Sequence, residues 1–253
     1  MTTLIKGALC YIGDGFQQMD VLIKDGKIDT LSTSISKNGV DAVIIAQDKY
    51  LVPGFVDVHV HLRQPGFSYK ETIKTGTLAA AAGGYTAVCS MPNVNPVPDS
   101  LEGIKAQTDI IYRDAVINVY PFASITKGRQ GRGETVDFNA LKDIAVGFSD
   151  DGTGVQDDDV MLKAMTECKK ADKIISAHCE VNSLLHGGYI HDGEYCKEHH
   201  HKGICSASEY EQIERDCRLA KKTGVHYHVC HISTKESVDI IRKAKACGVN
   251  GTC

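Results

Sequence analysis

The sequence has no uninterrupted apolar run approaching the roughly 20 residues that a helix needs to cross a bilayer. Its first residues, MTTLIKGALCYIGDG, lack the basic segment and the long apolar segment that together mark a signal peptide. There is no basic excess either, because the net charge is −4, and a nucleic-acid surface requires one. We therefore expect a cytoplasmic globular protein that binds neither membranes nor nucleic acid.

The ten cysteines form no C-x-x-C pair, which argues against a zinc ribbon or a thioredoxin-type site. They are scattered along the chain, and several lie in apolar, strand-like runs. In a cytoplasmic protein such residues behave as small apolar side chains. We expect buried free thiols rather than a disulfide framework.

Short strand-like segments fill the N-terminal part of the chain. Val21-Leu22-Ile23 and Lys27-Ile28 flank Asp25-Gly26, a dipeptide suited to the positive φ angles of a hairpin turn. Ala42–Ala46 is a further apolar run. Residues 1–50 are therefore predicted to form a small β subdomain.

From Leu51 onward, strand-like and helix-like segments alternate. Helices are predicted over Tyr69–Ala82 and Asp158–Ala171, and capping boxes at Ser206–Glu209 and Ser233–Glu236 predict two more. The last two should end at Gly224 and Gly248. The predicted strands are Phe55–Val60, Tyr85–Ser90, Val116–Tyr120, Ile144–Phe148, Lys173–Ala177 and Val225–Val229.

Such alternation is typical of a parallel sheet covered by helices. Because no dinucleotide-type glycine loop is present, it favours a (β/α)₈ barrel over a doubly wound sheet. A barrel needs eight units, and the chain stops at Val249–Cys253, where a seventh strand should begin. For residues 51–253 we predict a TIM-type barrel that is incomplete at the C-terminus, truncated after about six units. We therefore expect either that the sequence is a fragment or that something outside this chain completes the barrel.

Histidines stand at the ends of three predicted barrel strands. His59 and His61 end the first of these strands, and alternate residues of a strand point to one face, so both imidazoles can reach one metal ion. His178 and His231 follow two later strands, and Asp151 follows the fourth. Barrel enzymes build their sites at these strand ends. Four imidazoles and a carboxylate there predict a hydrolytic centre with one or two zinc ions.

Alternatives remain within this set. Asp150 could take the place of Asp151, and His228 that of His231; the later member of each pair is favoured because it lies closer to the strand end. The four histidines could also have no common function, each with its own hydrogen-bond partners, and Asp150-Asp151-Gly152 could be a turn. The His-rich loop 186–201 and the segment Gly128–Gly133 are interpreted as mobile or flexible loops, since the latter lacks the G-K-[ST] ending of a phosphate loop.

Arg63 and Asn93 are candidates for substrate binding. Arg63 lies two residues after the H-x-H pair, and Asn93 follows the second strand. A guanidinium beside an amide suits capture of a substrate carboxylate next to the metal. On spacing alone, a surface ion pair for Arg63 and a turn role for Asn93 stay equally open.

Four segments closely resemble the signature of class I dihydroorotases, a family of the amidohydrolase superfamily. They are PGFVDVHVHLRQPGFSYKETIKTGTLAAAAGGYTAVCSMPNVNPVPD, GFSDDGTGVQ, SAHCE and HVCHIST, in the family's order. The resemblance covers essentially the whole chain. It implies a metal-dependent (β/α)₈ hydrolase barrel with a small β-sandwich built from both chain ends.

The resemblance also implies a set of roles. The zinc ligands, for one or two Zn²⁺, would be His59, His61, Asp151, His178 and His231, and the carboxylate-binding pair would be Arg63 and Asn93. Relatives such as dihydropyrimidinases and hydantoinases use a carboxylated lysine on the fourth strand, where this chain offers Asp151. The family's general-base aspartate would lie beyond Cys253, so no catalytic general base is expected within the chain, and the chain alone is expected to lack part of the site.

The implied reaction is the reversible hydrolysis of L-dihydroorotate to N-carbamoyl-L-aspartate, a step of de novo pyrimidine biosynthesis. Partners implied by the family are a second copy of the chain or aspartate transcarbamoylase. Two alternatives stay open: a non-catalytic dihydroorotase-like subunit that supports aspartate transcarbamoylase, and a hydrolase of another cyclic amide, of dihydropyrimidinase or allantoinase type. Whether this chain is active by itself is left open as well.

Overall fold

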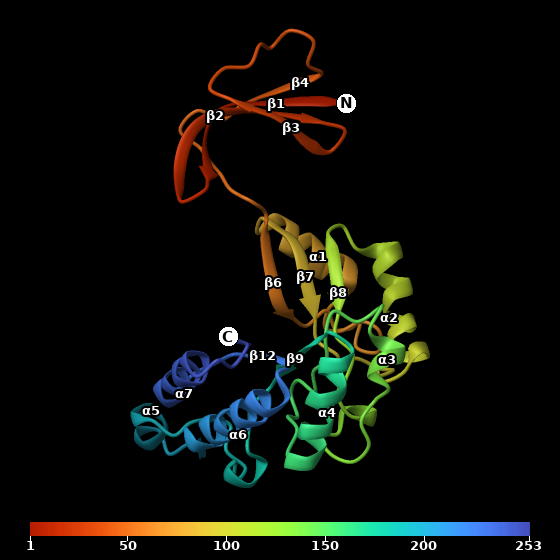
Figure 1. The fold of residues 1–253 in the computed structure, drawn as a ribbon, viewed down its shortest axis with the longest axis vertical. Coiled ribbons are helices and arrows are strands. Elements are labelled where there is room, and N and C mark those ends of the chain that lie inside the picture. The colour runs from red at the N-terminus through yellow and green to blue at the C-terminus, as the bar shows by residue number, and fades with distance from the viewer. The chain divides into compact units, whose positions relative to one another are not determined.

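The computed structural model describes the whole chain, Met1–Cys253. The chain divides into two compact units, Met1–Phe55 and Val56–Cys253 (Figure 1). None of its helices combines the length and the apolar character that crossing a membrane would demand.

The first unit is one five-stranded sheet. Its order is β3-β2-β1-β4, and β5 also pairs with β1. The strands are β1 (Thr2–Ile12), β2 (Gly15–Lys24), β3 (Lys27–Ser32), β4 (Ala42–Ile45) and β5 (Tyr50–Leu51). The predicted hairpin is confirmed, since β2 and β3 pair antiparallel around Asp25 and Gly26, whose φ angles are 50° and 77°. Residues 1–55 form a single sheet, so they do not contain the second layer of the predicted sandwich.

The second unit contains two three-stranded sheets, which together are called the strand wall. One sheet has the order β6-β7-β8 and a second has the order β9-β12-β13, and Phe148 joins them through parallel bridges to Ala123 and Ile175. The strands are β6 (Phe55–Val60), β7 (Tyr85–Ser90), β8 (Asn118–Pro121), β9 (Ile174–Ala177), β12 (His226–Val229) and β13 (Gly251–Thr252). The pairs β7–β8, β9–β12 and β12–β13 are parallel.

The fourth predicted strand, Ile144–Phe148, is much shorter in the structure. The chain turns just before it, because the amide of Ala145 donates to the carbonyl of Leu141. Only the amides of Val146 and Phe148 then reach their neighbours, Pro121 and Ile174. The segment therefore occupies the predicted place between β8 and β9 without forming a ladder of its own.

Helices cover this wall (Figure 1). They are α1 (Ile73–Ala82), α2 (Leu101–Asp114), α3 (Phe138–Leu141), α4 (Asp158–Lys170), α5 (Glu194–Glu198), α6 (Ala207–Thr223) and α7 (Lys235–Ala246). Short 3₁₀ turns at Lys127–Arg129 and Asn182–Leu184, and a two-stranded pair of β10 (Ile190–His191) with β11 (Gly203–Ile204), lie in the connections. Helix α1 contacts β7, α2 contacts β8, α4 contacts β9 and α6 contacts β12.

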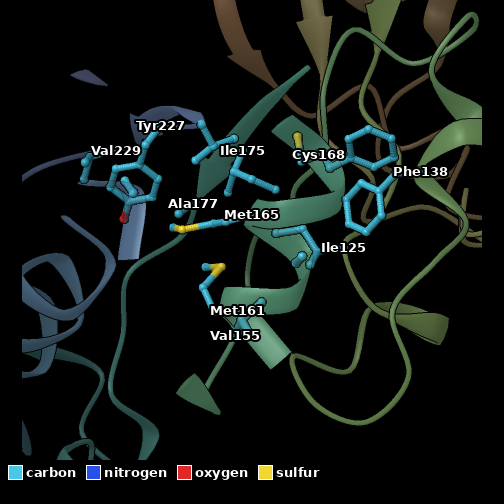
Figure 2. Close-up of a cluster of buried hydrophobic side chains, with 14 of the residues drawn as sticks. Ile125, Phe138, Val155, Met161, Met165, Cys168, Ile175, Ala177, Tyr227 and Val229 are labelled. Atoms are coloured by element: carbon cyan, nitrogen blue, oxygen red, sulfur yellow. The ribbon is translucent and has the colours of Figure 1, made fainter. Parts of the chain in front are cut away.

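Helix α4 fills the main core of the second unit. Met161, Met165 and Cys168 lie on its inward face, as the helical spacing predicts, and all are buried. Figure 2 shows them between Ile175 and Ala177 of β9 on one side and the ring of Phe138 on the other. This packing fixes β9 relative to the rest of the wall, and His178 directly follows β9.

The predicted helix starts are wrong at α1 and α7, and at α6 the start is confirmed but the predicted capping box does not form. Helix α1 begins at Ile73 rather than Tyr69, because residues 63–72 form turns and Thr72 caps the helix in a capping box with Thr75. At α6, Ser206 has helical φ and ψ and makes no side-chain cap, and the carboxylate of Glu209 reaches Ser233 instead. At α7 the cap is Thr234, whose hydroxyl accepts from the amide of Ser237. The predicted ends are confirmed, with φ of 68° at Gly224 and 85° at Gly248.

Candidate metal centre

His59 and His61 lie near the end of β6 and face the same carboxylate. The Nε2 atom of His59 lies 3.5 Å from one oxygen of Asp151, and Nε2 of His61 lies 3.6 Å from the other. The two rings meet edge to face at 5.2 Å between centroids. The alternation of a strand therefore brings both imidazoles to one place.

His178 and His231 approach Asp151 from the other sheet. The Nδ1 atom of His178 lies 3.0 Å from Nε2 of His231. The distances from these two nitrogens to Oδ1 of Asp151 are 3.6 Å and 3.3 Å. The residues form two groups that share Asp151, His59-His61-Asp151 and Asp151-His178-His231, and within each group the ligand atoms lie within 4.8 Å of one another.

Asp150 and Asp151, which follow the predicted fourth barrel strand, have different surroundings. The carboxylate of Asp150 points away from the histidines and accepts from the backbone amides of Ile125 (2.7 Å), Thr126 (3.1 Å) and Gly131 (3.1 Å), and from the hydroxyl of Thr126. Asp151 is the one that faces the imidazoles. The amide of the buried Gly131 is thus bound to Asp150, and the flexibility of Gly128–Gly133 stays a prediction.

His228 does not join the histidine groups. Its Nδ1 atom pairs with the hydroxyl of Thr252 on β13 at 2.9 Å. Its ring therefore lies at the contact between β12 and β13, whereas His231, just beyond the end of β12, faces Asp151. His231 has a φ of 27°, which is unusual for a residue with a side chain.

Asp151 carries a negative charge among the four imidazoles. Burial alone would raise the pKa of its carboxyl, but hydrogen bonds from His178 and His231 and the nearby charge of His59 lower that pKa far below its ordinary value. The hydrogen bond to Asp151 raises the pKa of His231, and burial lowers the pKa of His59. Asp151 is thus an ionised acceptor among four imidazoles.

This donor set fits a divalent transition-metal ion. Imidazole nitrogens with a single carboxylate suit zinc-like ions, whereas Ca²⁺ and Mg²⁺ need mainly oxygen ligands. The buried Nδ1 of His59 has no hydrogen-bond partner in the protein. The two groups of converging nitrogen and oxygen atoms could therefore hold such an ion.

Asn93 contacts the first group, and Arg63 follows His61 by two residues in the chain. The Oδ1 atom of Asn93 pairs with Nδ1 of His61 at 2.9 Å, which orients that ring and leaves its Nε2 directed at Asp151. Arg63 is half-buried and has a φ of 58°, and its guanidinium makes no hydrogen bond or ion pair within the chain. The surface ion pair considered for Arg63 is therefore absent.

Sequence reasoning missed several residues that hold this centre together. Arg129 donates to the carbonyl of Asp151 at 2.6 Å and to the hydroxyl of Thr153 at 2.8 Å. Glu180 pairs with Nε2 of His178 at 3.4 Å, on the side of the ring opposite Asp151. No sequence motif marks either residue, although Glu180 lies within SAHCE.

A cavity of about 220 Å³ adjoins the second group. Its lining includes His178, Glu180, His191, Glu209, His231 and Ser233. A larger hollow of about 660 Å³ along α3 and α4 is lined by none of the histidines. In the His-rich loop, His199 stacks on Tyr195, and no metal-binding group is formed there.

Comparisons with known proteins agree with this geometry. Residues 48–237 match the family described as dihydro-orotase-like. The chain is 50% identical over 251 residues to a dihydroorotase of Staphylococcus aureus (strain Mu50), which covers 98% of this chain and 59% of that protein. It is 47% identical to a dihydroorotase of Listeria monocytogenes serotype 4b, over 100% of this chain and again 59% of the relative. The chain therefore spans about three-fifths of the length of these relatives.

Solved structures agree at the level of the fold. An L-hydantoinase (dihydropyrimidinase) from Arthrobacter aurescens superposes with a TM-score of 0.85 at 21% identity, covering 99% of this chain and 57% of the other. A D-hydantoinase superposes with a TM-score of 0.81 at 22% identity, over 99% and 56% of the two chains. At such identity the likeness concerns the α/β barrel fold alone.

Proposed function

Because the chain belongs to the dihydro-orotase-like family of the amidohydrolase superfamily, we propose that it carries the metal centre of a dihydroorotase, the enzyme that interconverts L-dihydroorotate and N-carbamoyl-L-aspartate. The observation that carries the proposal is the convergence of His59, His61, His178 and His231 on the single carboxylate of Asp151. Relatives named dihydroorotase at about half identity support the same activity.

The proposed ligands hold one or two zinc ions in two overlapping groups. His59 and His61 serve the first group, His178 and His231 serve the second, and Asp151 serves both. Zinc bound there would lower the pKa of a coordinated water toward neutrality and polarise the carbonyl of the ring amide. The protein's own contribution is to orient the ligands, through Asn93 at His61 and Glu180 at His178.

Arg63 is proposed to hold the carboxylate of the substrate. Its guanidinium has no partner in the chain and lies two residues from His61, so it is free to make a bidentate ion pair beside the metal. The amide nitrogen of Asn93 stays available for the same carboxylate, because only Oδ1 is engaged with His61. Together they would fix the ring relative to the metal centre.

The residues of the predicted fourth barrel strand, between β8 and β9, favour dihydroorotate as the substrate over other cyclic amides. The segment Val146–Asp151 contains no lysine, so it cannot supply a carboxylated lysine, and the shared ligand is Asp151. Dihydrouracil and hydantoin also lack the carboxylate that Arg63 is proposed to bind. We therefore assign the chain to dihydroorotate chemistry rather than to that of its hydantoinase-like structural neighbours.

The finer features of the fold are part of the same proposal. Residues 1–50 form the small β subdomain and 51–253 the barrel, whose eight-unit closure and second sandwich layer are inferred from the family. The sequence of strands from β6 to β13 supports this interpretation. All ten cysteines are free thiols, which supports the proposed cytoplasmic location.

Zinc content and dihydroorotate hydrolysis, measured together on the zinc-supplemented chain, test this proposal. We expect His59→Ala to lower zinc affinity and turnover in parallel, because this ring faces Asp151 directly. His186→Ala, in the exposed loop, is the matched control and should change neither. Turnover that survives in a zinc-free His59→Ala protein would contradict the proposal. Absence of turnover from the folded, zinc-loaded chain would attribute the missing activity to the part of the relatives' length that this chain does not span, and zinc binding would then carry the test.

A further inference from the structure

Helix α6 carries a row of polar side chains on the face that packs against the strand wall. Glu209, Gln212 and Asp216 are spaced i, i+3 and i+7, which places them on one side of the helix. Gln212 and Asp216 are only 2% and 0% exposed. Apolar residues are expected on such a face, so buried polar groups there need specific partners.

The side chain of Gln212 forms two hydrogen bonds with the backbone at and just after His178. Its Nε2 donates to the carbonyl of His178 at 3.1 Å, and its Oε1 accepts from the amide of Glu180 at 3.1 Å. The side-chain amide thus binds the backbone on both sides of Cys179. Because both bonds are made to backbone atoms, they fix the direction in which the His178 side chain leaves the chain.

Glu209 holds the segment that follows His231. Its carboxylate accepts from the amides of Ser233 and Thr234 and from the hydroxyl of Thr234, each at 3.1 Å. It also accepts from the hydroxyl of Ser237 at 2.6 Å and from that of Ser233. Burial would raise the pKa of this carboxyl, but these hydrogen bonds lower it below its ordinary value.

The anchored segment lies next to a strained position. His231 has a φ of 27°, and such a backbone conformation persists only where the surrounding structure enforces it. Two residues later the chain is locked by Glu209, and on the other side Tyr227 of β12 donates to Asp216 at 3.0 Å. The backbone of His231 is therefore held from both directions by one helix.

We propose that this row positions His178 and His231 as a pair. Gln212 sets His178 and Glu209 sets His231, so that Nδ1 of the first and Nε2 of the second stand 3.0 Å apart and face Asp151. The inference rests on the proposed metal site. It concerns the second ligand group only, since none of these hydrogen bonds reaches His59 or His61 on β6.

Zinc binding to the 253-residue chain, measured by competition with a chromophoric chelator, tests the proposal. Glu209→Gln keeps the size of the side chain but turns a donor toward the amides of Ser233 and Thr234. We expect zinc affinity at the group containing His231 to fall by about 10- to 100-fold, as is typical when residues that orient ligands are removed. Gln212→Met, which acts through His178, should give a second, independent loss.

Asp157→Ala is the matched control for a lost helix cap. Asp157 accepts from the amide of Val160 at 2.9 Å at the start of α4 and touches none of the metal ligands. If Asp157→Ala and Glu209→Gln lower the melting temperature alike but only the second lowers zinc affinity, stability alone does not explain the loss. Equal zinc affinities for the two variants would overturn the inference.

A double-mutant cycle tests whether Glu209 affects zinc affinity through His231. In a His231→Ala background, Glu209→Gln should cause no further loss of zinc affinity, because the ligand through which it acts is gone. A full further loss there would show that Glu209 acts elsewhere and would overturn the inference while leaving the proposed function intact. A wild-type chain that binds no zinc would overturn the proposed function and this inference together.

Discussion

At the scale of single residues, the adjacent Asp150 and Asp151 have different roles because their carboxylates have different partners. Asp151 faces four imidazoles, whereas Asp150 receives three backbone amides from other parts of the chain. The sequence offered both, and only their hydrogen-bond partners distinguish them. Buried carboxylates with such different partners should respond differently to the same substitution.

We predict opposite effects for Asp151→Asn and Asp150→Asn. Asp151→Asn should weaken zinc binding, because the neutral amide of asparagine replaces the anionic ligand shared by the two groups. Asp150→Asn should lower the free energy of unfolding by about 1–3 kcal/mol, because the amide group of asparagine meets backbone donors with a donor of its own. Urea unfolding and zinc titration of the two variants check this. Loss of zinc binding in Asp150→Asn without loss of stability would contradict the assignment.

How far the sequence predicts the centre depends on the residue type. Histidines on alternate residues of a strand and at strand ends are visible in the sequence, because strand geometry determines where they point. Arg129, Gln212 and Glu209 were not predicted, because each reaches a residue more than 20 positions away in the chain. Such contacts depend on how the loops fold back, which no local pattern records.

At the scale of elements, strands and helix ends were predicted better than helix starts. β6 and β7 have the predicted bounds, and Gly224 and Gly248 end their helices as expected. The capping boxes failed at α6 and α7 because Glu209 binds the start of α7 rather than its own helix. The contact between Gly131 and Asp150 was not predicted for a similar reason, since the two residues are 19 positions apart.

Gly131→Ala should be far more harmful than Gly133→Ala. Both glycines have left-handed φ angles, 66° and 78°, so alanine costs about 1 kcal/mol at each. A Cβ at Gly131 would lie only 1.9 Å from the carbonyl oxygen of Gly154, whereas one at Gly133 meets nothing within 4 Å. We expect an additional loss of about 1–3 kcal/mol at Gly131. Equal unfolding free energies for the two variants would show that the loops do not pack as described.

The contact between α6 and β12 should make stability depend on pH through Asp216. Burial raises the pKa of this carboxyl from an ordinary 3.8 to about 6, although Arg215 and Tyr227 act against that rise. Between these two values the folded chain holds a proton that the unfolded chain has released, so the stability contributed by protonated Asp216 is lost as pH rises through this window.

Asp216→Asn supplies the measurement for this prediction. We expect the stability of the wild type relative to Asp216→Asn to fall as pH rises from 4 to about 6 and then to level off. Urea unfolding of both proteins in a chelator checks this, and titration of the histidines cancels in the difference. A relative stability that grows with pH would mean that the ion pair with Arg215, at 2.7 Å, outweighs burial.

At the scale of the whole molecule, the strand order brings together residues from distant parts of the sequence. His61 after β6 and His231 after β12 are separated by 170 positions in the chain, yet both lie within 3.6 Å of Asp151. The alternation of strands and helices predicted this convergence, because strand ends of a barrel gather on one face. The central claim is that this face recognises a ring that carries a carboxylate.

Binding of L-dihydroorotate to the zinc-loaded chain, compared with dihydrouracil, tests that claim most directly. Isothermal titration should show tighter binding of dihydroorotate, because Arg63 and Asn93 are proposed to bind its carboxylate. Arg63→Met should weaken dihydroorotate binding by about 10- to 100-fold, as expected for a lost charge-assisted hydrogen bond, and leave zinc content unchanged. Equal affinity for the two rings, or normal dihydroorotate affinity in Arg63→Met, would contradict the account.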